Sequence, residues 1–120
     1  MTAAEKAGQV ILARYPGENA LSEAQKYHLG GYVMFGVDFR GSTPEEITAE
    51  IAEIQSASKL RMLFAADEEG GTVVRISKYP QYRAEPFPAQ AEVLSQGLDA
   101  VSSEAQEISG LMSSMGLNMN

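Results

Sequence analysis

A chain of 120 residues, 44% of them hydrophobic, has room for one domain with a sizeable core. Nine basic and sixteen acidic residues give a formal net charge of −7, which argues against a nucleic-acid-binding protein and against a basic helix lying on a membrane surface. The absence of cysteine excludes disulfides, a thiolate nucleophile and cysteine-ligated zinc, and the single histidine, His28, excludes a multi-histidine metal site. We therefore expect neither a metal nor a cofactor.

The first third of the chain predicts two helices and a strand. Residues 2–5 (TAAE) have the form of a capping box, and apolar residues at helical spacing extend the first predicted helix to Arg14, before a Pro-Gly pair. A second capping signal at residues 22–25 predicts a short helix that ends at residues 30–31. Residues 32–35 (YVMF) form an unbroken apolar run, which predicts a strand buried on both faces.

Residues 43–58 carry the clearest helix signals. Thr43 is a good N-cap, and Glu46 completes a capping box with it. The stripe predicted to face a core consists of Ile47, Ile51, Ile54 and Ser58. A second apolar run follows at residues 62–66 (MLFAA), so strand, helix and strand form a βαβ unit with parallel strands and a right-handed crossover.

The rest of the chain predicts a long loop, a helix and a strand. Residues 67–88 are rich in glycine and proline, and a loop of this length in a compact domain is usually functional. The helix that follows is interrupted at Gly97 and ends at Gly116, a natural C-cap. Its predicted buried stripe consists of Val101, Ala105, Ile108, Met112 and Met115. Residues 117–120 (LNMN) predict the start of a third strand.

The order of these elements is that of the opening of a parallel α/β fold. A complete (β/α)8 barrel needs roughly 200 residues or more. We therefore predict that residues 1–120 are the N-terminal portion of a single TIM-barrel domain, with the first two parallel strands, their helices and the start of the third strand. An open barrel exposes a strand edge and an apolar face, so we expect self-association through this edge.

The sharpest candidate site is residues 67–71 (DEEGG), directly after the second predicted strand. In parallel α/β proteins ligands bind at the carboxyl ends of the strands. The carboxylate of Asp67 can accept hydrogen bonds from neighbouring hydroxyls, as sugar recognition requires, and Arg75 can place donors in the same cavity. The two glycines allow a sharp turn close to a ligand.

Other interpretations of the same residues stay open. The acidic triplet also suits a solvated turn in which Arg75 forms a plain ion pair, or a site for a divalent cation. His28 is expected at a helix end, where the helix dipole favours a protonated imidazole. The aromatic residues of the long loop suit either stacking on a sugar ring or pinning of the loop, and we favour pinning; they are Tyr79, Tyr82 and Phe87.

Four segments together resemble the N-terminal part of family 3 glycoside hydrolases, most closely the β-N-acetylhexosaminidase (β-N-acetylglucosaminidase) branch. They are residues 1–9 (MTAAEKAGQ), 30–36 (GGYVMFG), 67–75 (DEEGGTVVR) and 117–120 (LNMN). Their order and spacing extend the resemblance over essentially the whole chain. The resemblance implies a (β/α)8 barrel hydrolase of carbohydrate metabolism that releases terminal β-linked N-acetylglucosamine with retention, through an aspartate nucleophile and a covalent intermediate.

Position by position, the resemblance implies three roles in this chain. Asp67 would bond hydroxyls of the sugar in the −1 subsite, Arg75 would orient the loop or line the pocket, and Glu69 would be structural. The nucleophile segment and the loop histidine thought to be the acid/base in this branch have no counterpart here, and His28 precedes the first predicted strand. We therefore expect the chain alone to be inactive.

Two alternative functions remain: a non-catalytic carbohydrate-binding or interaction module, and a small metal-binding domain. The longest apolar run near the start, residues 10–13, is too short for a signal segment or a membrane span. The compartment stays open, cytoplasmic if Met1 is the native start and secreted or at the cell surface if an export signal has been removed.

Overall fold

The computed structural model describes residues 1–120 and confirms the α/β class with parallel strands. Strands β1 (Leu12–Arg14), β2 (Gly31–Met34) and β3 (Leu63–Ala66) form one parallel sheet in the order β1-β2-β3. An antiparallel pair, β4 (Glu68–Gly70) and β5 (Val73–Val74), directly follows β3. The three parallel strands form an open sheet, so closure into a barrel is not part of this structure.

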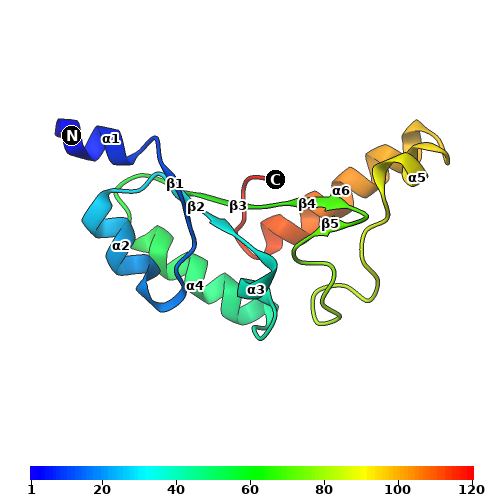
Figure 1. Ribbon diagram of the computed structural model, residues 1–120, viewed down its shortest axis with the longest axis horizontal. Helices are drawn as coiled ribbons and strands as arrows, with labels where there is room; N and C mark the ends of the chain where they lie inside the picture. The colour runs from blue at the N-terminus through cyan, green and yellow to red at the C-terminus, as the bar shows by residue number, and fades with distance from the viewer.

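The helices surround this sheet unevenly. They are α1 (Ala3–Gly8), the 3-10 turn η1 (Gly17–Asn19), α2 (Ala20–Tyr27), α3 (Gly36–Phe39), α4 (Pro44–Ser56), α5 (Gln90–Leu94) and α6 (Leu98–Ser114). Helices α2 and α4 contact each other and lie on the same side of the sheet, whereas α5 and the first part of α6 extend away from it (Figure 1). None of the helices combines the length and the hydropathy needed to cross a membrane.

The first helix is shorter than predicted, and the sheet has a strand that the sequence analysis missed. Helix α1 ends at Gly8, because the Gly8 carbonyl accepts bonds from the amides of Ile11 and Gly30, both at 3.0 Å, where the chain turns. A Cβ at Gly8 would clash with the Tyr27 carbonyl, so only glycine allows this approach to the end of α2. The residues predicted to continue the helix form β1, and Val10 is 86% exposed.

Helix α2 begins at Ala20, two residues before the predicted cap. The Ser22 hydroxyl does not cap it, because it donates to the Asn19 carbonyl at 2.9 Å instead. The helix ends at Tyr27, followed by His28 in the left-handed conformation with φ of 55°. The predicted position of His28 at a helix end is confirmed.

Helix α4 is confirmed with its predicted cap. The Thr43 hydroxyl accepts a bond from the Glu46 amide at 3.2 Å, and the Glu46 carboxylate accepts one from the Thr43 amide at 2.8 Å. The isoleucine stripe of this helix is buried, while Ser58 lies beyond its last residue and is half-buried.

The sheet is buried on one face only, so the prediction of a strand covered on both faces is wrong. Tyr32, Met34 and Phe64 point to the helices and are fully buried. On the other face Val33 is half-buried and Leu63 is 43% exposed. The physical reason is that α2 and α4 pack from one side, and no second layer of helices covers the other.

The predicted stripe of α6 is buried only at its end. Met112 and Met115 are buried and Ile108 is half-buried, but Val101 and Ala105 are exposed because they lie on the part of α6 that extends beyond the sheet. Gly116, with φ of 90°, ends the helix as predicted. Its amide donates to Ser113, and the amide of the buried Leu117 donates to Met112, which is the Schellman arrangement.

The predicted third strand is present as a single parallel bridge between Ala65 and Met119. Two side-chain amides extend this contact along the edge of β3. The Asn118 carboxamide accepts from the Phe64 amide at 2.9 Å, and the Asn120 carboxamide accepts from the Glu68 amide at 2.9 Å. Both carboxamides also donate to main-chain carbonyls of the same edge.

We predict that Thr43→Ala lowers the free energy of unfolding by about 1 kcal/mol, because it removes the acceptor for an otherwise unpaired amide at the start of α4. Urea unfolding followed by circular dichroism measures this change. Thr48→Ala is the matched control, since Thr48 lies on the same helix and bonds only the Pro44 carbonyl. Equal losses in the two variants would contradict the role of the cap.

Candidate functional site

Asp67 lies where sequence reasoning places a ligand-binding carboxylate, immediately after the carboxyl end of β3. The Arg75 guanidinium donates to it, with Nη2 3.3 Å from Asp67 Oδ2. The Asp67 side chain is 44% exposed, and its other oxygen, Oδ1, has no hydrogen-bond partner in the chain. The structure therefore brings the two predicted site residues together and leaves one acceptor atom free for a ligand.

Glu68, not Glu69, is the structural carboxylate of this loop. Glu68 is fully buried, and its Oε2 accepts from the amides of Arg75 at 2.8 Å and Ile76 at 2.7 Å. Its Oε1 accepts from the amide and the hydroxyl of Ser77. Glu69 is exposed, so the structural role expected for Glu69 is wrong. Glu68 holds the Arg75 backbone against the end of β3 and thereby places the guanidinium beside Asp67.

The two glycines of the loop allow a close approach between segments of the chain itself. Gly70 and Gly71 have φ of 86° and 64°, a conformation that favours glycine. A Cβ at Gly70 would clash with the Pro88 carbonyl, and the Gly71 amide donates to the Phe87 carbonyl at 2.9 Å. The close approach expected toward a ligand is therefore made to residues 87–89.

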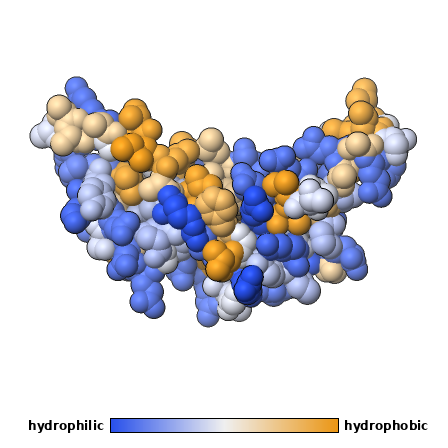
Figure 2. Space-filling view, viewed as in Figure 1, coloured by the Kyte–Doolittle hydropathy of each residue, from blue (hydrophilic) through white to orange (hydrophobic).

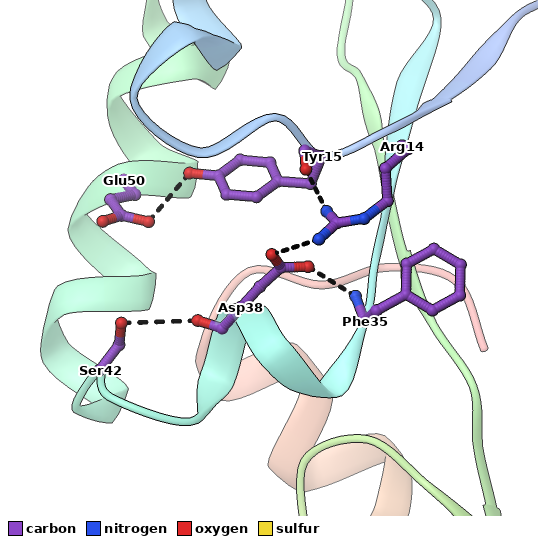
Figure 3. A network of polar contacts seen from close by, with 6 residues as sticks. All are labelled: Arg14, Tyr15, Phe35, Asp38, Ser42 and Glu50. Carbon is purple, nitrogen blue, oxygen red and sulfur yellow. Dashed lines mark hydrogen bonds and ion pairs between the residues drawn. The ribbon is translucent and has the colours of Figure 1, made fainter.

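A second polar network, which sequence reasoning missed, lies at the carboxyl ends of β1 and β2 (Figure 3). Arg14 Nη2 lies 2.7 Å from Asp38 Oδ1, and Asp38 Oδ2 accepts from the Phe35 amide at 2.7 Å. The neighbouring Tyr15 hydroxyl donates to the Glu50 carboxylate at 2.9 Å. Burial, followed by this hydrogen bond, raises the pKa of Tyr15 above its ordinary value. No sequence motif indicates this network, because Arg14 lies on β1, Asp38 on α3 and Glu50 on α4.

The Phe35 ring connects the two networks. The Arg14 guanidinium lies 5.2 Å from the ring centroid and the Arg75 guanidinium 5.9 Å, both within the range of cation–π contact. Phe35 is 38% exposed. A third cation, the Lys78 ammonium, lies beside Phe35. It packs against Gly36, in the space that a Cβ on this glycine would fill. The rim formed by Asp67, Arg75 and Phe35, together with Arg14, combines hydrogen-bonding groups with an exposed aromatic edge.

The aromatic residues of the long loop pin it to the core, as the favoured interpretation predicts for Tyr82 and Phe87. The Tyr82 hydroxyl donates to the Ser42 carbonyl at 2.8 Å, and burial raises the pKa of Tyr82 to about 12. Phe87 is buried. Tyr79 packs against the core, and its buried hydroxyl has no hydrogen-bond partner.

His28 lies at the opposite end of the sheet from Asp67, before the first residue of β2. It lines a pocket of about 360 Å³ at the amino ends of the strands, together with Glu5 and Lys59. The Thr2 amide and Lys59 hold the pKa of Glu5 at about 2. His28, the single histidine of the chain, is therefore too far from Asp67 to act as an acid or a base at that site. No three carboxylate or imidazole side chains lie close enough together to hold a metal ion.

No family model and no curated protein matches this chain in sequence comparisons.

We predict that Glu68→Gln lowers the free energy of unfolding by roughly 1–3 kcal/mol, because an amide cannot accept from all four buried donors that the carboxylate satisfies. Glu69→Gln removes the same charge from an exposed neighbour and should change stability by less than about 0.5 kcal/mol. Urea unfolding of both variants provides the comparison. A loss in Glu69→Gln as large as in Glu68→Gln would assign the effect to net charge.

Proposed function

We propose that this chain is the N-terminal part of a family 3-like (β/α)8 glycoside hydrolase and that the Asp67 rim binds a terminal β-linked N-acetylglucosamine. The observation that carries the proposal is the position of Asp67. Asp67 is the residue that directly follows the carboxyl end of the parallel strand β3. Arg75 orients its side chain, and its Oδ1 has no hydrogen-bond partner within the chain. A carboxylate oxygen in this state can accept a hydrogen bond from a sugar hydroxyl.

The fold gives the proposal its second support. The parallel strands follow each other in chain order, and α2 and α4 pack on the same side of the sheet, as in one sector of a barrel. The edge of β3 also accepts a further parallel segment at Met119. The partly exposed face with Val33 and Leu63 would then be the interior of the barrel, where side chains of further strands would cover it.

The carboxylates near the rim support the expectation that the chain alone does not hydrolyse its ligand. Retaining hydrolysis needs one carboxylate free to attack and a separate acid/base. Both oxygens of Asp38 are bonded, to Arg14 and to the Phe35 amide. Glu68 is buried and bonded at both oxygens. Asp67 retains one free oxygen, which suits ligand binding, while its other oxygen is held by Arg75.

A carbohydrate-binding module is the second candidate, because the same rim can bind a sugar without any catalytic group. The two candidates differ in the length of ligand they recognise. A subsite for one terminal ring binds N-acetylglucosamine and its short oligomers with similar affinity, whereas a module that binds along a chain gains affinity with each added sugar. Titration with a monomer, a dimer and a tetramer separates them.

We predict weak saturable binding of N-acetylglucosamine, measured by NMR titration, with a loss of at least about tenfold in Asp67→Ala. The reason is that the variant removes both the free acceptor and the partner that orients Arg75. Glu69→Ala is the matched control, since it removes an exposed carboxylate two residues away and should bind as the unmodified chain does. Absence of binding by the unmodified chain, or equal losses in both variants, would contradict the proposed sugar site.

We also predict no hydrolysis of a chromogenic N-acetyl-β-glucosaminide by the purified chain. The assay should be run at several values of pH, so that an unsuitable protonation state cannot account for a negative result. Turnover that co-purifies with the chain and is lost in Asp67→Ala would show that a complete catalytic set is present, contrary to this expectation.

A further inference from the structure

The two ends of this elongated molecule carry different charges. Residues 84–120 contain acidic residues and no lysine or arginine; the acidic residues are Glu85, Glu92, Asp99, Glu104 and Glu107. We call α5 and the first half of α6, residues 90–105, the acidic arm. We call residues 1–11 and 59–63 the basic end, because they expose Lys6, Lys59 and Arg61, and the only acidic residue there, Glu5, is paired with Lys59 at 3.0 Å.

Both ends also expose large apolar side chains. On the acidic arm Leu98 is 77% exposed, and Leu94 is exposed close to it in the chain. On the basic end Val10, Ile11 and Leu60 are exposed. Each end therefore combines an apolar surface with a net charge, and the signs of the net charge at the two ends are opposite. The acidic arm is therefore suited to a basic partner with exposed apolar side chains, and the basic end is suited to an acidic partner of the same kind.

The shape of the molecule allows the two surfaces to be used together. The molecule extends over 50 Å along its longest axis and 20 Å along its shortest. In Figure 2 the two ends rise above a hollow, and a stripe of hydrophobic residues crosses the region where Figure 1 places β1 and β2. A molecule of this shape can contact a neighbouring molecule at both of its ends at the same time.

We propose that the occupant of these surfaces is a second copy of this chain, bound antiparallel to the first across a twofold axis. In this dimer the acidic arm of each copy lies against the basic end of the other, so the same pair of contacts occurs twice. A basic amphipathic peptide would satisfy the arm but leave the basic end uncovered, whereas a second copy covers both. A standard interface takes roughly 800 Å² from each partner, a small share of the 7048 Å² accessible surface of the chain. The inference does not depend on sugar binding.

The first test measures the oligomeric state of the whole chain by sedimentation velocity over a concentration series up to about 1 mM. We expect a dimer whose dissociation constant rises at least about tenfold in Leu98→Arg, because the variant removes an apolar contact and places a cation against the basic end. Val37→Arg is the matched control: Val37, on α3, is also an exposed large hydrophobic residue, lies outside both surfaces and should leave the dimer unchanged. Circular dichroism checks that both variants stay folded.

The second test exchanges charges between the two surfaces. Asp99→Lys and Lys6→Glu should each weaken the dimer, and the double variant should regain at least part of the loss, because each altered arm then meets an altered basic end. Recovery in the double variant is a result that altered folding of a single variant cannot produce. A chain that stays monomeric over the whole series, or a dimer insensitive to Leu98→Arg, overturns the proposal; the latter would place the interface elsewhere, such as at the outer edge of β1.

Discussion

The arrangement of the candidate site depends on one buried carboxylate. Glu68 gathers the main-chain amides of three consecutive residues, Arg75 to Ser77, onto the end of β3. A buried charge is costly unless donors surround it, and here they do, so the loop has a strong preference for this conformation. Because Arg75 is one of the residues held, the position of its guanidinium beside Asp67 follows from the Glu68 contacts. Asp67 supplies the free acceptor of the proposed sugar site, and its neighbour Glu68 maintains the geometry of that site.

This division of roles also explains how a short acidic run can serve two purposes. Asp67 and Glu68 are adjacent and point in different directions, as consecutive residues of an extended chain must. One carboxylate is turned inward and fully bonded, and the other is turned toward solvent with an oxygen to spare. Phe35 and the two arginines beside it complete the outer rim, where each guanidinium is paired with a carboxylate.

Local signals in the sequence predict the elements whose structure is decided locally. The capping box at Thr43, the isoleucine stripe of α4 and the glycine that ends α6 depend on residues within a few positions of each other, and all are confirmed. The strands β2 and β3 and their parallel pairing follow from apolar runs joined by an amphipathic helix. The position of Asp67 after β3 follows from the same pattern, so this part of the site could be predicted.

The features that the sequence did not reveal depend on contacts between distant segments. Residues 12–14 have a helical pattern but pair with β2, because Gly8 allows the chain to turn against the end of α2. The structural acid is Glu68 instead of Glu69, because burial is decided by the return of Arg75 to Ser77, which no spacing rule contains. The contact of Arg14 with Asp38 joins residues 24 positions apart and has no local signature.

The two asparagines beside β3 have a consequence for how this sheet can assemble. Asn118 and Asn120 sit two positions apart, and each carboxamide both donates to and accepts from the main chain of that edge. A slip of the segment by one residue would put Met119 where an amide is needed and leave main-chain groups of β3 unpaired. The two asparagine side chains thus select one register for the segment that pairs with β3 and disfavour registers shifted by one residue.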